Sequence, residues 1–280
     1  MKIVVASGKG GTGKTTVAVN LALSMGSCTL IDCDVEEPNC ALFLNTDLKH
    51  LEDVTVYVPE YDLEKCTFCQ ECSRFCRFNA VAVIPPETLL FFPELCHSCG
   101  GCSIVCEYGA VTERAKGIGV IETGTTNGVR IYQGKCNVGV ANVMPIIKRL
   151  KSLETGENVV FDSPPGTACP MNETVKNADV ALLVTEPTPF GLHDLKLAVE
   201  TVRKLGVPLG VIINRDGIGD DGVERYCKAE GIRIIMRIAE DRRIAELYSV
   251  GIPFVLELED MKERFKALVE DIPSLMEAGT

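Results

Sequence analysis

The sequence predicts an α/β fold in which a doubly wound parallel sheet is interrupted by a small inserted domain. Three observations predict this arrangement. Short β-branched runs alternate with helical stretches, a glycine-rich loop follows the first run, and eight of the 14 cysteines gather in the middle of the chain. The chain has 280 residues, 46% hydrophobic and 24% charged, which suits one large globular domain or two smaller ones.

The strands of the predicted sheet are apolar runs with helical stretches between them. This alternation is typical of a parallel sheet covered on both faces, with right-handed crossovers. The predicted strands lie within residues 2–6, 28–34, 158–166, 179–187, 209–215 and 232–238. Helices are expected at 13–25 and 190–206, and the strand-like runs 117–124 and 128–134 lead back to the sheet.

The first predicted strand leads into a glycine-rich loop. Its residues GKGGTGKT match the phosphate-loop pattern G-x-x-x-x-G-K-[ST], placed between a strand and a helix. Backbone N–H groups of such a loop turn toward phosphate oxygens, and the helix N-terminus adds positive potential. We therefore expect ATP here, with Lys14 at the β- and γ-phosphates and Thr15 holding Mg²⁺. The predicted nucleotide-binding residues are Gly8, Lys9, Gly10, Gly11, Thr12, Gly13, Lys14, Thr15, Thr16 and Asn214.

Lys9 is a second lysine of this loop, five residues before Lys14. With it the sequence resembles the deviant-Walker ATPases, the group of MinD, ParA, Mrp and the nitrogenase iron protein. The resemblance implies that Lys9 reaches the phosphates of a partner subunit. ATP would then drive formation of a homodimer, or of a heterodimer with a related ATPase chain. The resemblance also implies ATP hydrolysis, with Lys9 and Lys14 among the catalytic groups.

Carboxylates follow two of the predicted strands. Asp32 and Asp34 end the run LIDCD, and Asp162 ends VVFD. A carboxylate there can orient the attacking water or the waters of Mg²⁺. By the resemblance Asp34 is the catalytic group, and Asp32 and Asp162 lie near the metal. The resemblance also places Asn214 on the adenine edge, although an asparagine at a strand end is common for turn reasons alone.

A duplicated cysteine pattern occupies the middle of the chain. Residues 66–76 and 96–106 share the spacing C-x₂-C-x₂-C-x₃-C, 30 residues apart. Bacterial ferredoxins use this run, in which three close cysteines hold one [4Fe–4S] cluster and the fourth ligates the other. Zinc modules offer paired cysteines, so zinc leaves the third cysteine of each half without a role. The predicted ligand sets are Cys66, Cys69, Cys72 and Cys106 for the first cluster, and Cys96, Cys99, Cys102 and Cys76 for the second.

The whole chain resembles a MinD-type ATPase with an inserted two-cluster ferredoxin-like α+β domain. We expect the ATPase domain at 1–57 and 116–280 and the insert at 58–115. Arg77 and Glu107 stand where the ferredoxin run usually has proline, so the following turns and the reduction potentials stay open. Cys136 and Cys169 are candidate ligands of a third cluster bridging two subunits, by likeness to the nitrogenase iron protein. The alternative is that both are small buried thiols.

Charge and hydropathy limit the partners. The net charge of −11 makes the chain a poor non-specific ligand for nucleic acid or anionic membranes. No run of 18 uncharged apolar residues and no signal peptide are evident, so we expect a cytoplasmic protein with reduced cysteines. The acidic stretch 258–276 is expected to form a helix packed on the sheet instead of one lying on a membrane.

Three classes of function follow. In the first, ATP binding and hydrolysis gate [4Fe–4S] electron transfer between a redox donor and an acceptor. In the second, the protein assembles or delivers clusters to an apo-metalloprotein client. In the third, it is a MinD/ParA-type positioning ATPase with a redox sensor. The closed ferredoxin pattern favours redox clusters, and the absence of a basic membrane-binding tail argues against the third class.

Overall fold

The structure is a computed structural model that describes residues 1–153 and 156–277 and divides into two compact units. Unit 1 contains Met1–Leu51, Ile121–Lys135 and the chain from Ile147 onward, and unit 2 contains Glu52–Val120 and Cys136–Ile146. The division differs from the predicted boundaries at 57/58 and 115/116, chiefly because unit 2 also takes Cys136–Ile146. Residues 154–155 and 278–280 of the predicted ATPase domain lie outside the described residues.

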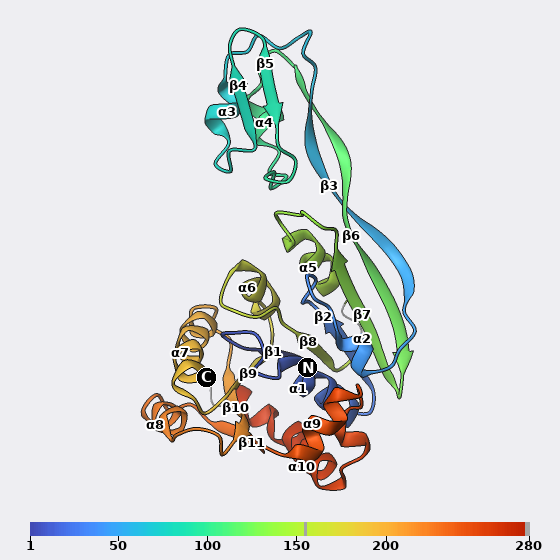
Figure 1. Ribbon diagram of the computed structural model, residues 1–280, viewed down its shortest axis with the longest axis vertical. Helices are drawn as coiled ribbons and strands as arrows, with labels where there is room; N and C mark the ends of the chain where they lie inside the picture. Colours follow the sequence, from blue (N-terminus) through green and yellow to red (C-terminus); the bar gives the residue numbers. More distant parts are fainter. Residues whose placement is uncertain (154–155, 278–280) are drawn as a thin grey trace. The chain divides into compact units, whose positions relative to one another are not determined.

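Strands and helices alternate through most of the chain (Figure 1). The strands are β1 (Lys2–Ala6), β2 (Cys28–Asp32), β3 (Lys49–Tyr61), β4 (Val81–Ile84), β5 (Thr88–Phe91), β6 (Val111–Thr126), β7 (Val129–Cys136), β8 (Val159–Asp162), β9 (Val180–Thr185), β10 (Leu209–Asp216) and β11 (Ile234–Ala239). The helices are α1 (Lys14–Ser24), α2 (Cys40–Phe43), α3 (Glu71–Phe75), α4 (Gly101–Val105), α5 (Met144–Lys151), α6 (Cys169–Val175), α7 (Pro189–Lys204), α8 (Gly222–Ala229), α9 (Arg242–Ser249), the 3₁₀ helix η1 (Phe254–Leu256), α10 (Glu259–Asp271) and α11 (Pro273–Glu277).

The main sheet has the strand order β11-β10-β9-β1-β8-β2-β7-β6-β3. All six strands predicted from apolar runs are present in it, and each pairs in parallel with its neighbours from β11 through to β7. β9, β10 and β11 follow one another outward on one side of β1, and β8 and then β2 lie on its other side, so the chain winds in both directions as in a doubly wound sheet. The prediction of a parallel α/β sheet is confirmed over this part.

The edge of the sheet beyond β7 departs from the parallel pattern. β6 and β7 are joined by Asn127 and Gly128, whose φ angles are 48° and 79°. Such a two-residue turn belongs to an antiparallel hairpin. β3, which no apolar run predicts, then pairs with β6 at the sheet edge. Most of its side chains are exposed, because an edge strand does not need the buried run of a central one.

Helices cover both faces of the sheet in unit 1. Val17 and Leu21 of α1 share one buried core cluster with Met261 and Phe265 of α10, so the C-terminal helix packs as the sequence predicts. α7 packs against β9 through buried side chains that include Leu195, outside that cluster. Among the described residues, no helix is both long and apolar enough to cross a membrane.

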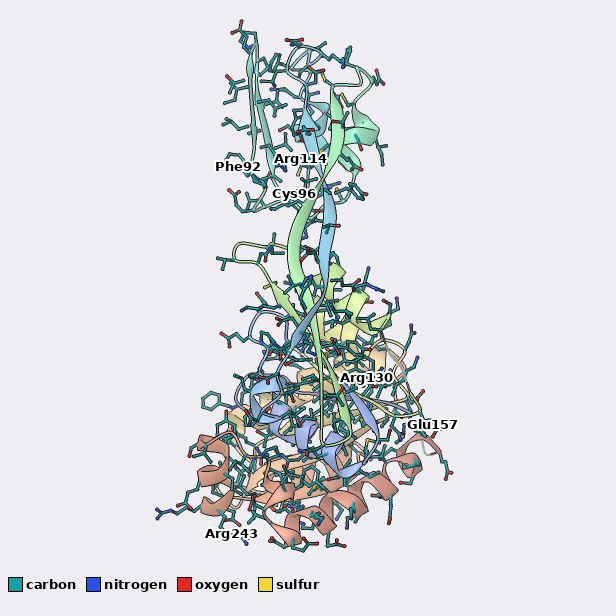
Figure 2. The ribbon with its side chains drawn as sticks, turned by 90° about the vertical axis from the view of Figure 1, so that its right-hand side faces the viewer. Phe92, Cys96, Arg114, Arg130, Glu157 and Arg243 are labelled. Carbon is teal, nitrogen blue, oxygen red and sulfur yellow. The ribbon has the colours of Figure 1, made fainter. Side chains whose placement is uncertain are left out.

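Unit 2 repeats its backbone as well as its sequence. α3 and α4 occupy corresponding places in the two halves and contact each other, and β4 and β5 form an antiparallel pair. Residues with left-handed φ recur 30 positions apart, in the pairs Phe68 and Ser98, Gln70 and Gly100, and Asn79 and Gly109. Figure 2 marks Phe92, Cys96 and Arg114 of this unit. The duplicated cysteine pattern is therefore carried on a duplicated backbone.

Candidate functional site

The phosphate loop connects β1 to the buried start of α1. Gly11 and Gly13 have φ angles of 78° and 92°, a region that costs glycine nothing and other residues a steric penalty. A Cβ added at Gly13 would collide with the side-chain amide of Asn214, and one at Gly8 with the carbonyl of Asp194. The loop is therefore packed closely against the end of β10 and against α7, which fixes its shape.

Lys14, Thr15 and Asp162 meet at the N-terminal end of α1. Lys14 is buried, with 6% of its surface exposed, and Thr15 Oγ1 donates a hydrogen bond of 2.6 Å to Asp162 Oδ2. Burial raises the pKa of Asp162, and the charge of Lys14 opposes this rise. The other carboxylate oxygen, Oδ1, is buried and has no hydrogen-bond partner among the described residues. A hydroxyl beside an unpartnered carboxylate oxygen fits the needs of a hydrated Mg²⁺ ion.

Asp32 and Asp34 have different surroundings at the end of β2. Asp32 is fully buried and accepts the backbone N–H groups of Asp34 at 3.1 Å and of Asn39 and Cys40, both at 3.0 Å. Burial, and then the charge of Asp162, raise the pKa of Asp32 to about 7. Burial also raises the pKa of Asp34 to about 6, although Lys14 lowers it in part. Asp34 is partly exposed and lines the pocket described next, whereas Asp32 is held by the backbone.

A pocket of about 320 Å³ lies beside the phosphate loop. Both polar and apolar side chains line it, which is expected of a site for a nucleotide. The polar lining includes Gly10, Gly11, Gly13, Lys14, Thr15, Thr16, Asp34, Asn214 and Arg215, and the apolar lining includes Phe43, Ile238, Ile244, Tyr248 and Phe254. Asn214 also donates its amide to the carbonyl of Thr12 at 2.9 Å, so it contacts the loop as well as the pocket.

Lys9 forms an ion pair within its own chain. Its Nζ lies 3.3 Å from Oε2 of Glu186, a residue with 7% of its surface exposed that also pairs with Arg215 at 2.8 Å. No motif of the sequence includes Glu186. Its only signal is a glutamate directly after the apolar run of β9, where the carboxyl end of a parallel strand faces the ligand edge of the sheet.

The structure brings the first predicted set of cluster ligands together. Cys66, Cys69, Cys72 and Cys106 line one small cavity in unit 2, closed by Tyr61 and other side chains. Burial raises the pKa of the Cys72 thiol to about 11, and the nearby sulfurs of Cys102, Cys66 and Cys69 raise it further. Four thiols around one cavity match the ligand number of a [4Fe–4S] cluster.

The second predicted set surrounds Cys102. Burial raises the pKa of the Cys102 thiol, the neighbouring Tyr61 hydroxyl opposes the rise, and the charges of Cys76, Cys99 and Cys96 add to it. Cys102 also acts on Cys72 of the first set, and the other three members of its own predicted set act on it. They include Cys76, which comes from the first half of the repeat.

Cys136 and Cys169 fall in different units. Cys136 ends β7 and is half-buried, and Cys169 begins α6 and is exposed. The alternative that both are buried thiols is therefore wrong for Cys169. A third, bridging cluster stays a prediction.

The fold and the phosphate loop define a nucleotide-binding P-loop protein of the MinD and ParA type. The chain belongs to the family described as the CobQ/CobB/MinD/ParA nucleotide binding domain, whose model matches residues 3–254. An uncharacterized protein of Methanocaldococcus jannaschii is 33% identical over 94% of this chain and 94% of its own. An iron-sulfur cluster carrier protein of Pyrococcus horikoshii is 26% identical over 91% of this chain and 79% of its own. The cell division ATPase MinD of Pyrococcus furiosus shares the fold, with a TM-score of 0.61 at 22% identity and 98% of each chain covered.

Proposed function

We propose that the protein is a Mg²⁺-dependent ATPase that couples a nucleotide-driven conformational switch to electron transfer through two [4Fe–4S] clusters held by residues 58–115. The observation that carries this proposal is the cavity of unit 2 that is lined by Cys66, Cys69 and Cys72 from the first half of the repeat together with Cys106 from the second half. When bound, the clusters supply one-electron chemistry. The chain itself holds them with thiols and shields them with the apolar side chains of unit 2.

The nucleotide half of the proposal rests on the charges around the pocket. Lys14 neutralises the β- and γ-phosphates, and Thr15 and Asp162 hold the hydrated Mg²⁺, with Asp32 behind them. Asp34 orients the attacking water, since its carboxylate lines the pocket and the positive charge of Lys14 favours its ionised form. Such positioning and electrostatic stabilisation account for most of the catalysis in phosphoryl transfer. Asn214 is assigned to the adenine end.

The dimer half of the proposal rests on Lys9. In the single chain Glu186 holds this lysine. In the ATP-bound dimer Lys9 leaves Glu186 and binds the phosphates of the partner subunit. The Lys9–Glu186 ion pair therefore breaks only when the more highly charged phosphates are present. The partner is a second copy or a related chain. M. jannaschii has two proteins similar to this one, at 33% and 31% identity. Two related chains in one organism are compatible with a heterodimer.

Switching reaches unit 2 through the chain itself. Residues 33–48 connect Asp32 to β3, and β3 and β6 carry the chain into unit 2 and back. One short helix, α2, and one strand, β3, therefore link the metal-facing end of β2 to unit 2. This connectivity supports coupling between nucleotide and clusters.

Cluster delivery is the second candidate. Relatives from P. horikoshii and M. jannaschii, each 26% identical, are named iron-sulfur cluster carrier proteins. The two candidates predict different fates for the iron. Cluster-loaded protein is incubated anaerobically with an apo-ferredoxin and, separately, with a low-potential redox dye, each with and without Mg-ATP. ATP-dependent reduction of the dye with iron retained supports electron transfer, and ATP-dependent movement of iron to the apo-ferredoxin supports delivery.

A further inference from the structure

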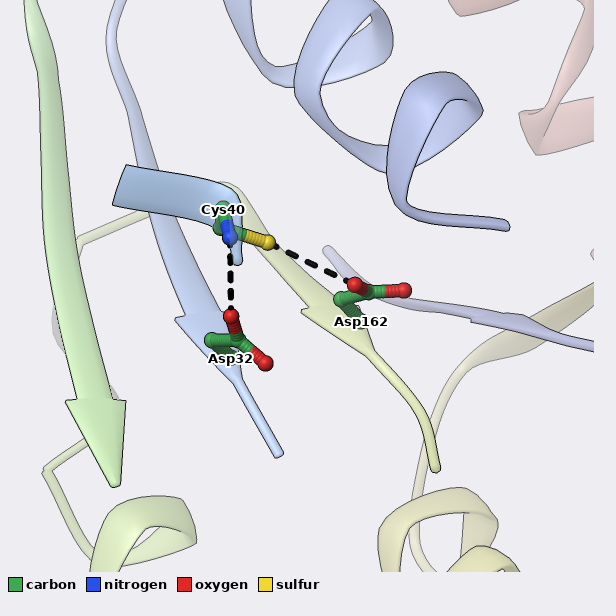
Figure 3. Close-up of side chains that lie close together, drawn as sticks. All are labelled: Asp32, Cys40 and Asp162. Carbon is green, nitrogen blue, oxygen red and sulfur yellow. Dashed lines mark hydrogen bonds between the residues drawn. The ribbon is translucent and has the colours of Figure 1, made fainter. Parts of the chain in front are cut away.

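A buried group of metal-ligating side chains lies beside the nucleotide pocket. Asp32 and Asp162 end the neighbouring parallel strands β2 and β8, and Cys40 is the first residue of α2 (Figure 3). One ligand atom from each residue lies within 4.8 Å of the others. All three residues have 0% of their surface exposed. Both aspartates end predicted strands, whereas no motif of the sequence includes Cys40.

The contacts of Cys40 join this residue to both carboxylates. Its thiol donates a hydrogen bond of 3.4 Å to Asp162 Oδ2, and its backbone N–H donates to Asp32 Oδ2 at 3.0 Å. Mg²⁺ takes oxygen ligands, whereas thiolates suit softer ions, Zn²⁺ among them. One sulfur and two carboxylates therefore form a ligand set that suits a thiophilic divalent ion. Mg²⁺ would use only the oxygen atoms of this set.

The electrostatics of the group also call for a cation. Two carboxylates are buried close to each other, and Asp162 Oδ1 has no hydrogen-bond partner in the described part of the chain. Lys14 is the nearby positive charge that acts on Asp162. It is the residue assigned to the phosphates, so it does not serve the carboxylates alone when nucleotide is bound.

We propose that Asp32, Cys40 and Asp162 form a binding site for one thiophilic divalent cation, with Zn²⁺ as the test ion. On binding, the S–H bond of Cys40 breaks, a sulfur–zinc bond forms, and the proton passes to water with no change of oxidation state. The cation shares the Asp162 carboxylate with the Mg²⁺ site, because Thr15 donates to the same carboxylate. Zinc at this site therefore competes with Mg-ATP and makes the ATPase sensitive to the metal ions around it. The inference does not depend on the clusters.

The test measures zinc on the cluster-loaded full chain under anaerobic conditions. Equilibrium dialysis gives the stoichiometry, and zinc K-edge X-ray absorption gives the ligands. We expect one zinc per chain, with one sulfur at about 2.3 Å and oxygens at about 2.0–2.2 Å. Mg-ATP should lower the bound zinc, and Cys40→Ala should abolish binding. Cys227→Ala, which removes a buried thiol from α8 outside the group, should bind zinc like the wild type.

Several outcomes would overturn the proposal. Wild-type protein that binds no zinc would do so. Zinc bound by four sulfurs, or zinc that is still bound by Cys40→Ala, would lie at vacant cluster cysteines. Either result would contradict the proposal. Cys40→Ser keeps the side-chain volume and serves if Cys40→Ala does not fold, with Mg-ADP binding as the check on folding. Failure of the proposed function is seen separately, as a chain that takes up no iron yet still binds zinc through one sulfur.

Discussion

Asp34 is a carboxylate whose ionisation decides whether it can act. Burial raises its pKa to about 6, against the pull of Lys14. A group with a raised pKa is protonated below that value, so the fraction of active carboxylate falls as the pH decreases through about 6. Bound Mg²⁺ favours the ionised form and can only move this inflection lower.

The prediction is that ATP hydrolysis weakens on acidification toward pH 6 and below. Asp34→Asn should lower kcat by about 10²–10⁴-fold while Mg-ATP still binds. The measurement is phosphate release across pH 5–8 together with nucleotide affinity. Glu36→Gln, at an exposed position two residues on, is the matched control and should behave like the wild type. Hydrolysis by Asp34→Asn at the wild-type rate would remove Asp34 from the mechanism.

Lys9 supplies a second prediction at this scale. Lys9→Ala should keep nucleotide binding in the single chain and lose ATP-dependent dimerisation, because no lysine then reaches the partner's phosphates. Glu186→Gln should lower the ATP concentration needed for dimers, because Lys9 is no longer held in its own chain. Light scattering after size exclusion measures both variants. Equal dimerisation by Lys9→Ala and the wild type would contradict the assignment.

Single residues also show where sequence reasoning stops. Asp32 and Asp162 could be placed near each other because the carboxyl ends of parallel strands meet at one edge of the sheet. Cys40 could not, because it reaches Asp162 only through the reversal of the chain between β2 and α2, which no periodic pattern records. Glu186 was missed for a related reason, since its partners Lys9 and Arg215 are distant in sequence.

At the scale of elements, the hairpin of β6 and β7 depends on one glycine. Gly128 has a φ angle of 79°, and a Cβ there would lie 2.6 Å from the carbonyl oxygen of Gly26. Gly128→Ala should therefore destabilise the protein by about 1 kcal/mol or more. Gly117→Ala in β6 is the control, because nothing lies within 4 Å of its added Cβ and its φ is ordinary. Urea unfolding measures both, and equal midpoints would refute the prediction.

The elements that the sequence predicts best are those buried on both faces. β1, β8 and β9 are continuous apolar runs, and a parallel sheet gives such runs no exposed face. β3 was missed because its pairing partner lies some fifty residues further along the chain and its side chains are mostly exposed. Long-range pairing at a sheet edge leaves little pattern in a single sequence.

At the scale of the whole molecule, the proposed ligation in unit 2 predicts that a substitution in one half of the repeat removes iron from the cluster held mainly by the other half. Cys106→Ser lies in the second half of the repeat, yet it should disturb the cluster held by Cys66, Cys69 and Cys72. We expect it to remove up to about half of the iron and sulfide. Cys28→Ser, at a buried position in β2, should leave the iron unchanged. Full iron content in Cys106→Ser, with unaltered cluster spectra, would argue against the crossed ligation.

The coupling of nucleotide to clusters is the central claim, and the reduction potentials test it most directly. They are measured by anaerobic EPR titration of the reduced clusters, with and without Mg-ATP. The account predicts a shift on the order of 59 mV for one electron, which corresponds to roughly 1.4 kcal/mol of coupling free energy. Unchanged potentials in a protein that still hydrolyses ATP would contradict the account and would favour cluster delivery or positioning.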